Sequence, residues 1–294
     1  MMRIEVSNPM STRVPAPLDQ LHSLSKRDMR SKSEPGMVFA FKTHWPEYLI
    51  EASGLGFFML SACLFSALLF HPASPAAIAI ETPVLRRLLM GMAMGATAIS
   101  IIYSPWGKRS GAHTNPATTL TFFRLGKIAA ADAVFYVLAQ FVGGLIGVML
   151  AAKLLGGVIA DPAVNYAATL PGDTGSLAAF FAEVLISFVL MSVILRVSNA
   201  AGWEQFTGLC AGLLVATYIT IEAPVSGMSM NPARTFASAL PAKAWMGLWI
   251  YFTAPLMGML AAAEVYRSLS RGKVRCAKLH HRNNQRCIFR CGYK

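Results

Sequence analysis

Charged residues are scarce in this 294-residue chain: they make up 14% of it, whereas about 25% is typical of soluble domains. Hydrophobic residues reach 55%, and the mean hydropathy is +0.49. This balance disfavours both a water-soluble globule and a disordered chain. Five cysteines in a chain of this length also exclude a small scaffold built on disulfides. The composition therefore predicts a membrane protein with several spans.

Acidic residues are scarcer still, 14 against 26 basic ones, which gives a formal net charge of +12. Seven of the basic residues lie in 1–46 and nine in 267–294, so the excess flanks an apolar body. The positive-inside rule explains this pattern without nucleic acid and places both ends in the cytoplasm. We therefore expect a multi-pass protein of the cell (inner or plasma) membrane, surrounded by the lipid bilayer and crossing it an even number of times.

Six stretches are apolar enough to cross a bilayer, which takes about 20 residues each. These are 48–70, 86–104, 128–152, 177–198, 204–223 and 244–266. Connections rich in Pro, Gly, Ser and Asp separate them. Residues 1–43 lack the apolar segment of a secretory signal and are expected to form a disordered cytoplasmic tail.

Two of the connections contain the same motif. Residues 110–125 read SGAHTNPATTLTFFRL, and residues 226–240 read SGMSMNPARTFASAL. Three spans and one such segment make up each half, 44–160 and 161–268, so the second half must be inverted relative to the first. The predicted fold is an all-α membrane protein with six transmembrane helices and two re-entrant half-helices.

Each Asn-Pro-Ala run is a helix start, because Asn is a strong N-cap and Pro suits the first helical position. Two half-helices that enter from opposite faces would meet at their N-termini near the middle of the membrane. The predicted pore centre comprises Asn115, Pro116, Ala117, Asn231, Pro232 and Ala233. The carbonyl groups predicted to line the approaches belong to Gly111, Ala112, His113, Gly227 and Ser229. Such a centre accepts neutral hydrogen-bonding solutes and repels cations.

The paired segments, with Arg234 directly after the second, closely resemble the aquaporin or major intrinsic protein family over about residues 45–268. The second segment is similar to bacterial and plant nodulin-like members. The resemblance implies a homotetramer with one pore per protomer. An enzyme is disfavoured because the sequence shows no set of nucleophile and base and no glycine-rich phosphate loop, and no cofactor is expected in the pore. The resemblance also implies that Arg234 is the cation-repelling donor of the outer constriction; otherwise that buried arginine would require an ion pair.

Counting from the motifs, the resemblance places the rest of this selectivity filter at Met228, Ile219 and Met94, or at Gly95 if the second span is aligned without a gap. Water-specific members carry an aromatic residue in the second span and a histidine at the Ile219 position, and both are missing here. Thr235 and the pair Tyr251-Phe252, in contrast, resemble water-conducting members.

The predicted function is therefore a passive channel for water and possibly other small neutral solutes. One alternative is a channel of the same fold for glycerol, metalloid hydroxides or hydrogen peroxide. A second is a coupled secondary transporter, since inverted repeats with half-helices occur there as well. Coupling would need carboxylates exposed to the pathway.

Three polar side chains within the apolar body need partners. Glu51 and Glu183 occupy matching positions in the two halves, and we expect backbone amides of the re-entrant loops to hold them as structural carboxylates. A proton relay is the alternative. For His113, packing with a hydrogen bond to the backbone competes with a pH-sensitive gate.

Residues 269–294 form a basic cytoplasmic tail with the sequence CAKLHHRNNQRCIFRC at 276–291. This tail contains a candidate set of zinc ligands: Cys276, Cys287 and Cys291, with His280 or its neighbour His281. No cofactor other than this zinc ion is expected. The alternative is a basic segment that lies on anionic lipid.

Overall fold

The computed structural model describes residues 36–270, 274–281 and 284–293, and the regular elements within them are all helical. The α-helices are α2 (Met37–Phe70), α3 (Pro75–Ala79), α4 (Pro83–Tyr103), α5 (Pro105–Ser110), α6 (Pro116–Arg124), α7 (Ala130–Leu155), α8 (Ser176–Asn199), α9 (Thr207–Ile221), α10 (Ala223–Ser226), α11 (Pro232–Ala242) and α12 (Leu248–Ser270). Short 3-10 helices are η1 (Gly156–Ala160), η2 (Asn165–Ala167) and η3 (Glu204–Phe206).

Within the described residues, six helices are long and apolar enough to cross a membrane: α2, α4, α7, α8, α9 and α12. They coincide with the six expected spans, which confirms the predicted fold class. The boundary of the N-terminal tail was wrong in part, because α2 begins at Met37. Burial explains the longer helix: Ala40 is fully buried, and the ring of Phe41 lies 5.4 Å from that of Phe135 on α7. Residues 1–35 lie outside the described residues.

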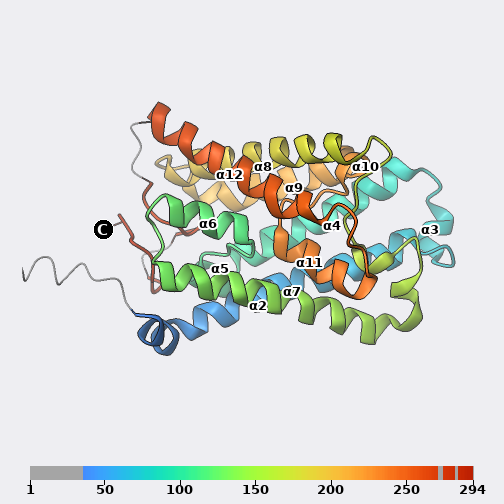
Figure 1. The fold of residues 1–294 in the computed structure, drawn as a ribbon, viewed down its shortest axis with the longest axis horizontal. Coiled ribbons are helices and arrows are strands. Elements are labelled where there is room, and N and C mark those ends of the chain that lie inside the picture. The colour runs from blue at the N-terminus through green and yellow to red at the C-terminus, as the bar shows by residue number, and fades with distance from the viewer. Residues whose placement is uncertain (1–35, 271–273, 282–283, 294) are drawn as a thin grey trace, which may run out of the picture. The chain divides into compact units, whose positions relative to one another are not determined.

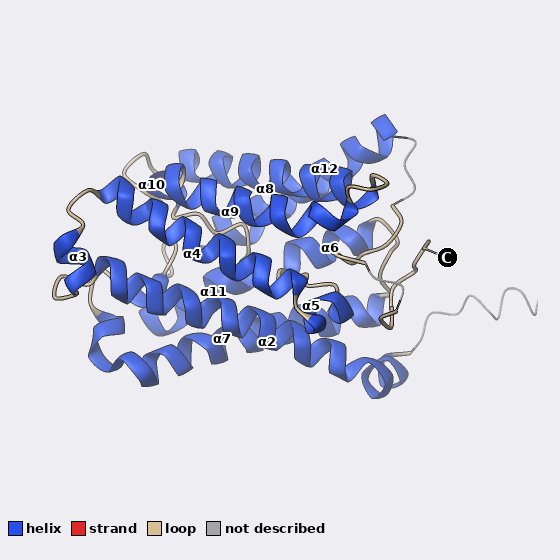
Figure 2. Cartoon of the chain, turned by 180° about the vertical axis from the view of Figure 1, so that it is seen from behind, coloured by secondary structure: helices blue, strands red, loops and turns tan. Residues whose placement is uncertain are grey.

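The two halves repeat the same helix packing. In the first half α2 packs along α7, and in the second α8 packs along α12. The short helices α6 and α11 occupy opposite halves of the bundle and begin near its middle (Figure 1). The described start of α2 and the end of α12 lie at the same end of the bundle, as an even number of spans requires (Figures 1 and 2).

Glycines allow the paired helices to approach each other closely. A Cβ atom added to Gly143 would lie 2.0 Å from the carbonyl oxygen of Ala52, and one added to Gly147 would lie 2.1 Å from that of Gly56. In the second half, a Cβ on Gly258 would lie 2.3 Å from the carbonyl oxygen of Val184. Small residues at helix contacts are what membrane helices use to bring backbones together. These contacts fix the frame that holds the two half-helices.

Candidate functional site

The two Asn-Pro-Ala runs start α6 and α11 by the same capping geometry. The Oδ1 atom of Asn115 accepts from the amide of Ala117 at 2.8 Å. The Oδ1 atom of Asn231 accepts from the amides of Ala233 and Arg234 at 3.1 and 3.2 Å. Each cap satisfies N–H groups that a helix start leaves without intrahelical partners. Both helices therefore begin with their positive ends at the asparagines.

The side-chain amides of the two asparagines also tie the half-helices together. Asn115 Nδ2 donates to the carbonyl oxygen of Met230 at 2.7 Å, and Asn231 Nδ2 donates to that of Thr114 at 2.8 Å. An amide nitrogen carries two N–H groups, and these crossed bonds use one on each side. Among the described residues, the second N–H of each asparagine has no hydrogen-bond acceptor, and it can therefore donate to a solute in the cavity that both residues line.

The loops before the asparagines have an unusual backbone. Ala112 and Thr114 have φ angles of 54° and 43°, and Met228 and Met230 have 52° and 54°. Non-glycine residues rarely adopt this left-handed region, which costs about 1–3 kcal/mol per residue when the surrounding structure imposes it. Such loops persist only if strong contacts hold them.

Two buried carboxyl groups supply these contacts. Glu51 accepts from the amides of His113 and Thr114 at 3.1 and 2.6 Å. Glu183 accepts from the amides of Ser229 and Met230 at 2.6 and 2.7 Å. Each group also accepts from a serine hydroxyl of its loop, and Glu51 takes a further bond from Gln140. Both carboxyl groups are thus occupied by the loops and lie fully buried.

Two tyrosines complete the twofold pattern. Tyr136 donates to the carbonyl oxygen of Ser110 at 2.7 Å, and Tyr251 donates to that of Ser226 at 2.5 Å. Each tyrosine lies on the third spanning helix of its half. This correspondence adds a matched pair that the motif comparison had not identified.

A cavity of about 430 Å³ runs past the two asparagines. The predicted residues among its lining are Met94, Ala112, His113, Asn115, Ile219, Gly227, Met228, Ser229, Asn231 and Arg234. Of the two alternatives for the second span, Met94 lines the cavity, whereas Gly95 packs against α9, where an added Cβ would lie 2.6 Å from the carbonyl oxygen of Gly212. The three other predicted filter residues, Met94, Ile219 and Met228, are apolar and line the same cavity as Arg234.

Several predicted residues lie beside the cavity rather than on it. Gly111 does not line it, because its carbonyl oxygen accepts from the amide of Leu279 at 3.1 Å, so its predicted place in the carbonyl ladder is wrong. Ala117 and Ala233 are fully buried in the starts of α6 and α11. Pro116 and Pro232 are the first residues of those helices and are buried as well. These four side chains shape the helix starts.

Arg234 projects from the first turn of α11 and lines the cavity. Its Nη1 atom is buried and has no hydrogen-bond partner among the described residues. The ion pairs formed within that part of the chain do not include it. Arg234 therefore brings a positive charge to the cavity wall, while one of its donors is buried without a partner among the described residues.

His113 is packed and bonded on both ring nitrogens. Nδ1 lies 3.1 Å from Thr119 Oγ1, and Nε2 lies 2.8 Å from the carbonyl oxygen of Ala277. Its ring also stacks between Phe122 and Phe289, with centroids 5.2 and 5.4 Å away. This arrangement matches the packing interpretation of His113, with a partner from the distant tail that sequence reasoning did not foresee.

The cavity has lining residues that sequence reasoning missed. Leu279 reaches it from the tail, and Ala163, Val164, Ala167 and Ala168 reach it from the connection between the two halves. Thr169, in the same connection, bonds Thr235 of α11 at 2.8 Å between hydroxyl oxygens. These residues lie in irregular segments without a motif or period, so the sequence carries no signal for them.

The tail brings three of its four predicted ligands together. The ligand atoms of Cys276, Cys287 and Cys291 lie within 4.8 Å of one another, and the fourth member of this group is His281. His280, the first of the two candidate histidines, is not part of this group. Its ring packs edge-on against that of Tyr103, with centroids 5.1 Å apart. Two adjacent histidines in an irregular segment project in different directions, so the choice between them depended on the backbone.

Comparisons with known proteins point to one family. The family model described as "Major intrinsic protein" matches residues 41–266. "Glycerol uptake facilitator protein-like 6" of Lactiplantibacillus plantarum is 36% identical over 60% of this chain and 82% of its own length. "Aquaporin NIP1-2" of Arabidopsis thaliana is 35% identical over 66% of this chain and 68% of its own length. The solved aquaglyceroporin of Plasmodium falciparum shares the fold, with a TM-score of 0.67, 20% identity, and coverage of 78% of this chain and 97% of that one.

Proposed function

We propose, from the premise that this chain belongs to the major intrinsic protein family, that its cavity conducts water and admits other small neutral solutes. Members of this family are passive channels rather than enzymes, and the chain is accordingly a small-solute channel of a membrane. The choice of solute class rests on one observation: the N-termini of α6 and α11 lie together, joined by hydrogen bonds of Asn115 and Asn231. Their positive ends and the free asparagine N–H groups favour an uncharged hydrogen-bonding solute over a cation.

Glycerol is the second solute we propose. Met94, Ile219 and Met228 add apolar surface to the cavity wall, which suits the carbon backbone of a polyol. A methionine side chain is flexible and adapts to solutes of different shape. Metalloid hydroxides and hydrogen peroxide share the same neutral, hydrogen-bonding chemistry and remain further candidates.

A coupled transporter fits less well with the carboxyl groups inside the bundle. Coupling requires an acidic group that faces the pathway and changes its proton or ion occupancy. Glu51 and Glu183 are each held by at least three hydrogen-bond donors from the re-entrant loops and neighbouring side chains. Neither lines the cavity.

The solute range is measured by stopped-flow light scattering on proteoliposomes. We expect fast water efflux and slower re-swelling in glycerol, both above empty liposomes. Ile219→His should reduce glycerol entry more than water flux, because it replaces an apolar side chain of the wall by a polar ring that does not suit the carbon backbone of a polyol. Ile221→His is the matched control, since Ile221 is 67% exposed on the same helix and does not line the cavity. Water flux without any glycerol entry would restrict the proposal to water.

We further propose that four chains assemble in the cell membrane with both termini in the cytoplasm. The basic ends support the orientation. The resemblance to the family supports the assembly of four chains. Light scattering of the detergent-purified protein should give the mass of four chains; a monomer would contradict the assembly.

A further inference from the structure

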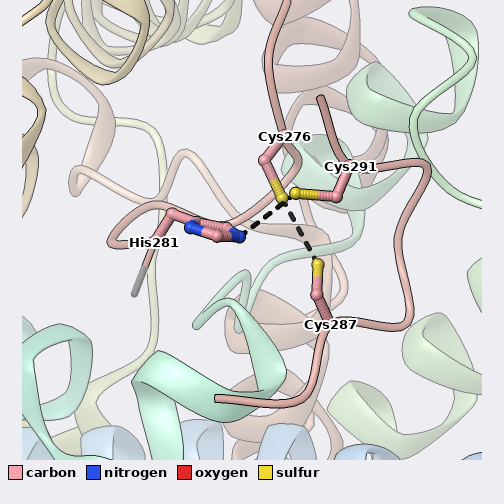
Figure 3. Close-up of side chains that lie close together, drawn as sticks. All are labelled: Cys276, His281, Cys287 and Cys291. Atoms are coloured by element: carbon pink, nitrogen blue, oxygen red, sulfur yellow. Dashed lines mark hydrogen bonds between the residues drawn. The ribbon is translucent and has the colours of Figure 1, made fainter. Parts of the chain in front are cut away.

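Four side chains of the tail converge at the end of the bundle where the described chain ends lie (Figures 1 and 3). They are Cys276, His281, Cys287 and Cys291, whose ligand atoms all lie within 4.8 Å of one another. Cys276 is buried and the other three are half-buried. Three sulfur ligands and one imidazole nitrogen are a set that structural zinc sites use.

The distances within this cluster are close to those of a tetrahedral zinc site. Zinc bound at 2.3 Å to sulfur and 2.0–2.1 Å to nitrogen places its ligand atoms about 3.5–3.8 Å apart. Here Cys276 Sγ lies 3.5 Å from Cys287 Sγ, and Cys291 Sγ lies 3.1 Å from His281 Nε2. The sulfur atoms are too far apart for a disulfide, and a Cys276–Cys287 disulfide would not explain why the other two side chains join them.

The surroundings also suit a metal-thiolate group. Zinc with three thiolates and a neutral histidine carries a net charge of −1. Lys278 is 2% exposed, and its Nζ atom donates to the carbonyl oxygen of Arg286, the residue before the ligand Cys287, at 2.6 Å. A buried cation on this stretch of the tail favours the negative charge of a metal–thiolate group. His281 is oriented by stacking on Tyr293, with ring centroids 4.2 Å apart.

The cluster fixes a stretch of backbone against the channel. Ala277 lies between the ligands Cys276 and His281, and its carbonyl oxygen is 2.8 Å from His113 Nε2. In the same stretch, the amide of Leu279 donates to the carbonyl oxygen of Gly111 at 3.1 Å, and Leu279 lines the cavity together with His113 and Asn115. A tail fastened by the cluster therefore places an apolar side chain in one mouth of the cavity.

We propose that Cys276, His281, Cys287 and Cys291 bind one zinc ion, which fastens the tail so that Leu279 narrows this mouth of the channel. Binding displaces the three thiol protons and holds together ligands from both sides of the 282–286 connection. Loss of the metal releases this cross-link and lets Leu279 withdraw. The metal site stands on the tail geometry alone, whereas the effect on flux rests on the proposed channel function.

Metal binding is tested on the full-length, reduced protein in detergent, by zinc content after purification and by titration with Zn²⁺ or Co²⁺. We expect one metal per chain and the absorption of tetrahedral cobalt-thiolate. His281→Ala and Cys287→Ser should each weaken binding by about tenfold or more. The matched controls His280→Ala and Cys210→Ser should keep wild-type affinity, since neither residue belongs to the cluster.

Two results would overturn the metal site. One is a reduced, monodisperse wild-type protein that takes up neither zinc nor cobalt. The other is a reversed pattern, in which His280→Ala loses the metal and His281→Ala retains it. Size-exclusion profiles that match the wild type show that a variant is folded, and Cys291→Ser provides an independent ligand variant if Cys287→Ser does not fold.

The effect on flux is tested in proteoliposomes with a membrane-permeant zinc chelator. Chelation should raise water permeability several-fold in the wild type and in His280→Ala. In His281→Ala and Leu279→Ala the water permeability should already be raised before chelation, so the chelator should change it little. Unchanged permeability after complete zinc removal would overturn the narrowing by Leu279. If Leu279→Ala and the chelated wild type both conduct no more water than empty liposomes, the channel function itself fails, while zinc content still decides the metal site.

Discussion

Replacing Arg234 by valine should let protons and small cations leak through the channel while water continues to pass. Arg234 lines the cavity and forms none of the ion pairs found among the described residues, so its charge acts on any ion in the pathway. Two unit charges 4 Å apart repel by about 4 kcal/mol at an effective dielectric constant of 20, which corresponds to roughly a thousandfold change in occupancy. The half-helix ends at Asn115 and Asn231 retain part of the barrier. We therefore expect a leak at least tenfold above that of the wild type.

The leak is measured with a pH-sensitive dye inside proteoliposomes under an imposed potassium potential, alongside water flux in the same preparation. Arg234→Lys is the matched control, because it keeps the charge while it changes the shape of the donor. It should remain tight to protons. Wild-type tightness in Arg234→Val, with water flux preserved, would show that the helix ends exclude cations without Arg234.

The sequence could predict the half-helices because their information is local. A capping asparagine, a proline at the first helical position, and the repetition of this pattern in two halves are all readable without tertiary structure. The partners of Glu51 and Glu183 were also predictable in kind, since a buried carboxyl group beside a loop of free amides has few alternatives. The crossed bonds of Asn115 and Asn231 were not, because they depend on how closely the two loops approach.

Other features depended on packing that leaves no pattern in the chain. The choice between Met94 and Gly95 follows from the close contact of α4 with α9, which occupies the Gly95 position. The correct histidine of the tail, His281, follows from a backbone without helical or strand periodicity. The longer α2 agrees with the burial of Ala40 and the ring contact of Phe41 with Phe135 on α7, which a hydropathy window centred on the membrane does not register.

Removing the carboxyl group of Glu183 should abolish water conduction and destabilise the second half of the bundle. Glu183 is fully buried and accepts from Ser226 Oγ and from the amides of Ser229 and Met230 at 2.6–2.9 Å. Hydrogen bonds to a charged acceptor contribute about 1.5–3 kcal/mol each, and buried donors left without a partner cost a similar amount. Glu183→Ala loses all three bonds at once. The left-handed residues Met228 and Met230 would then lose the carboxyl contact of their loop that offsets part of their backbone strain.

Glu183→Gln separates the hydrogen bonds from the shape of the side chain. A glutamine keeps one oxygen acceptor but turns an NH₂ group toward a loop that presents N–H donors, so we expect partial loss of thermal stability and of flux. Glu264→Gln is the matched control, because Glu264 is about half exposed and pairs with Arg124 and Arg267 at the surface. Thermal unfolding in detergent and water flux per folded protein are the measurements. A Glu183→Ala variant with the wild-type Tm and flux would mean that the loop keeps its shape without the carboxyl group, and that the crossed bonds between the half-helices suffice to hold the pore centre.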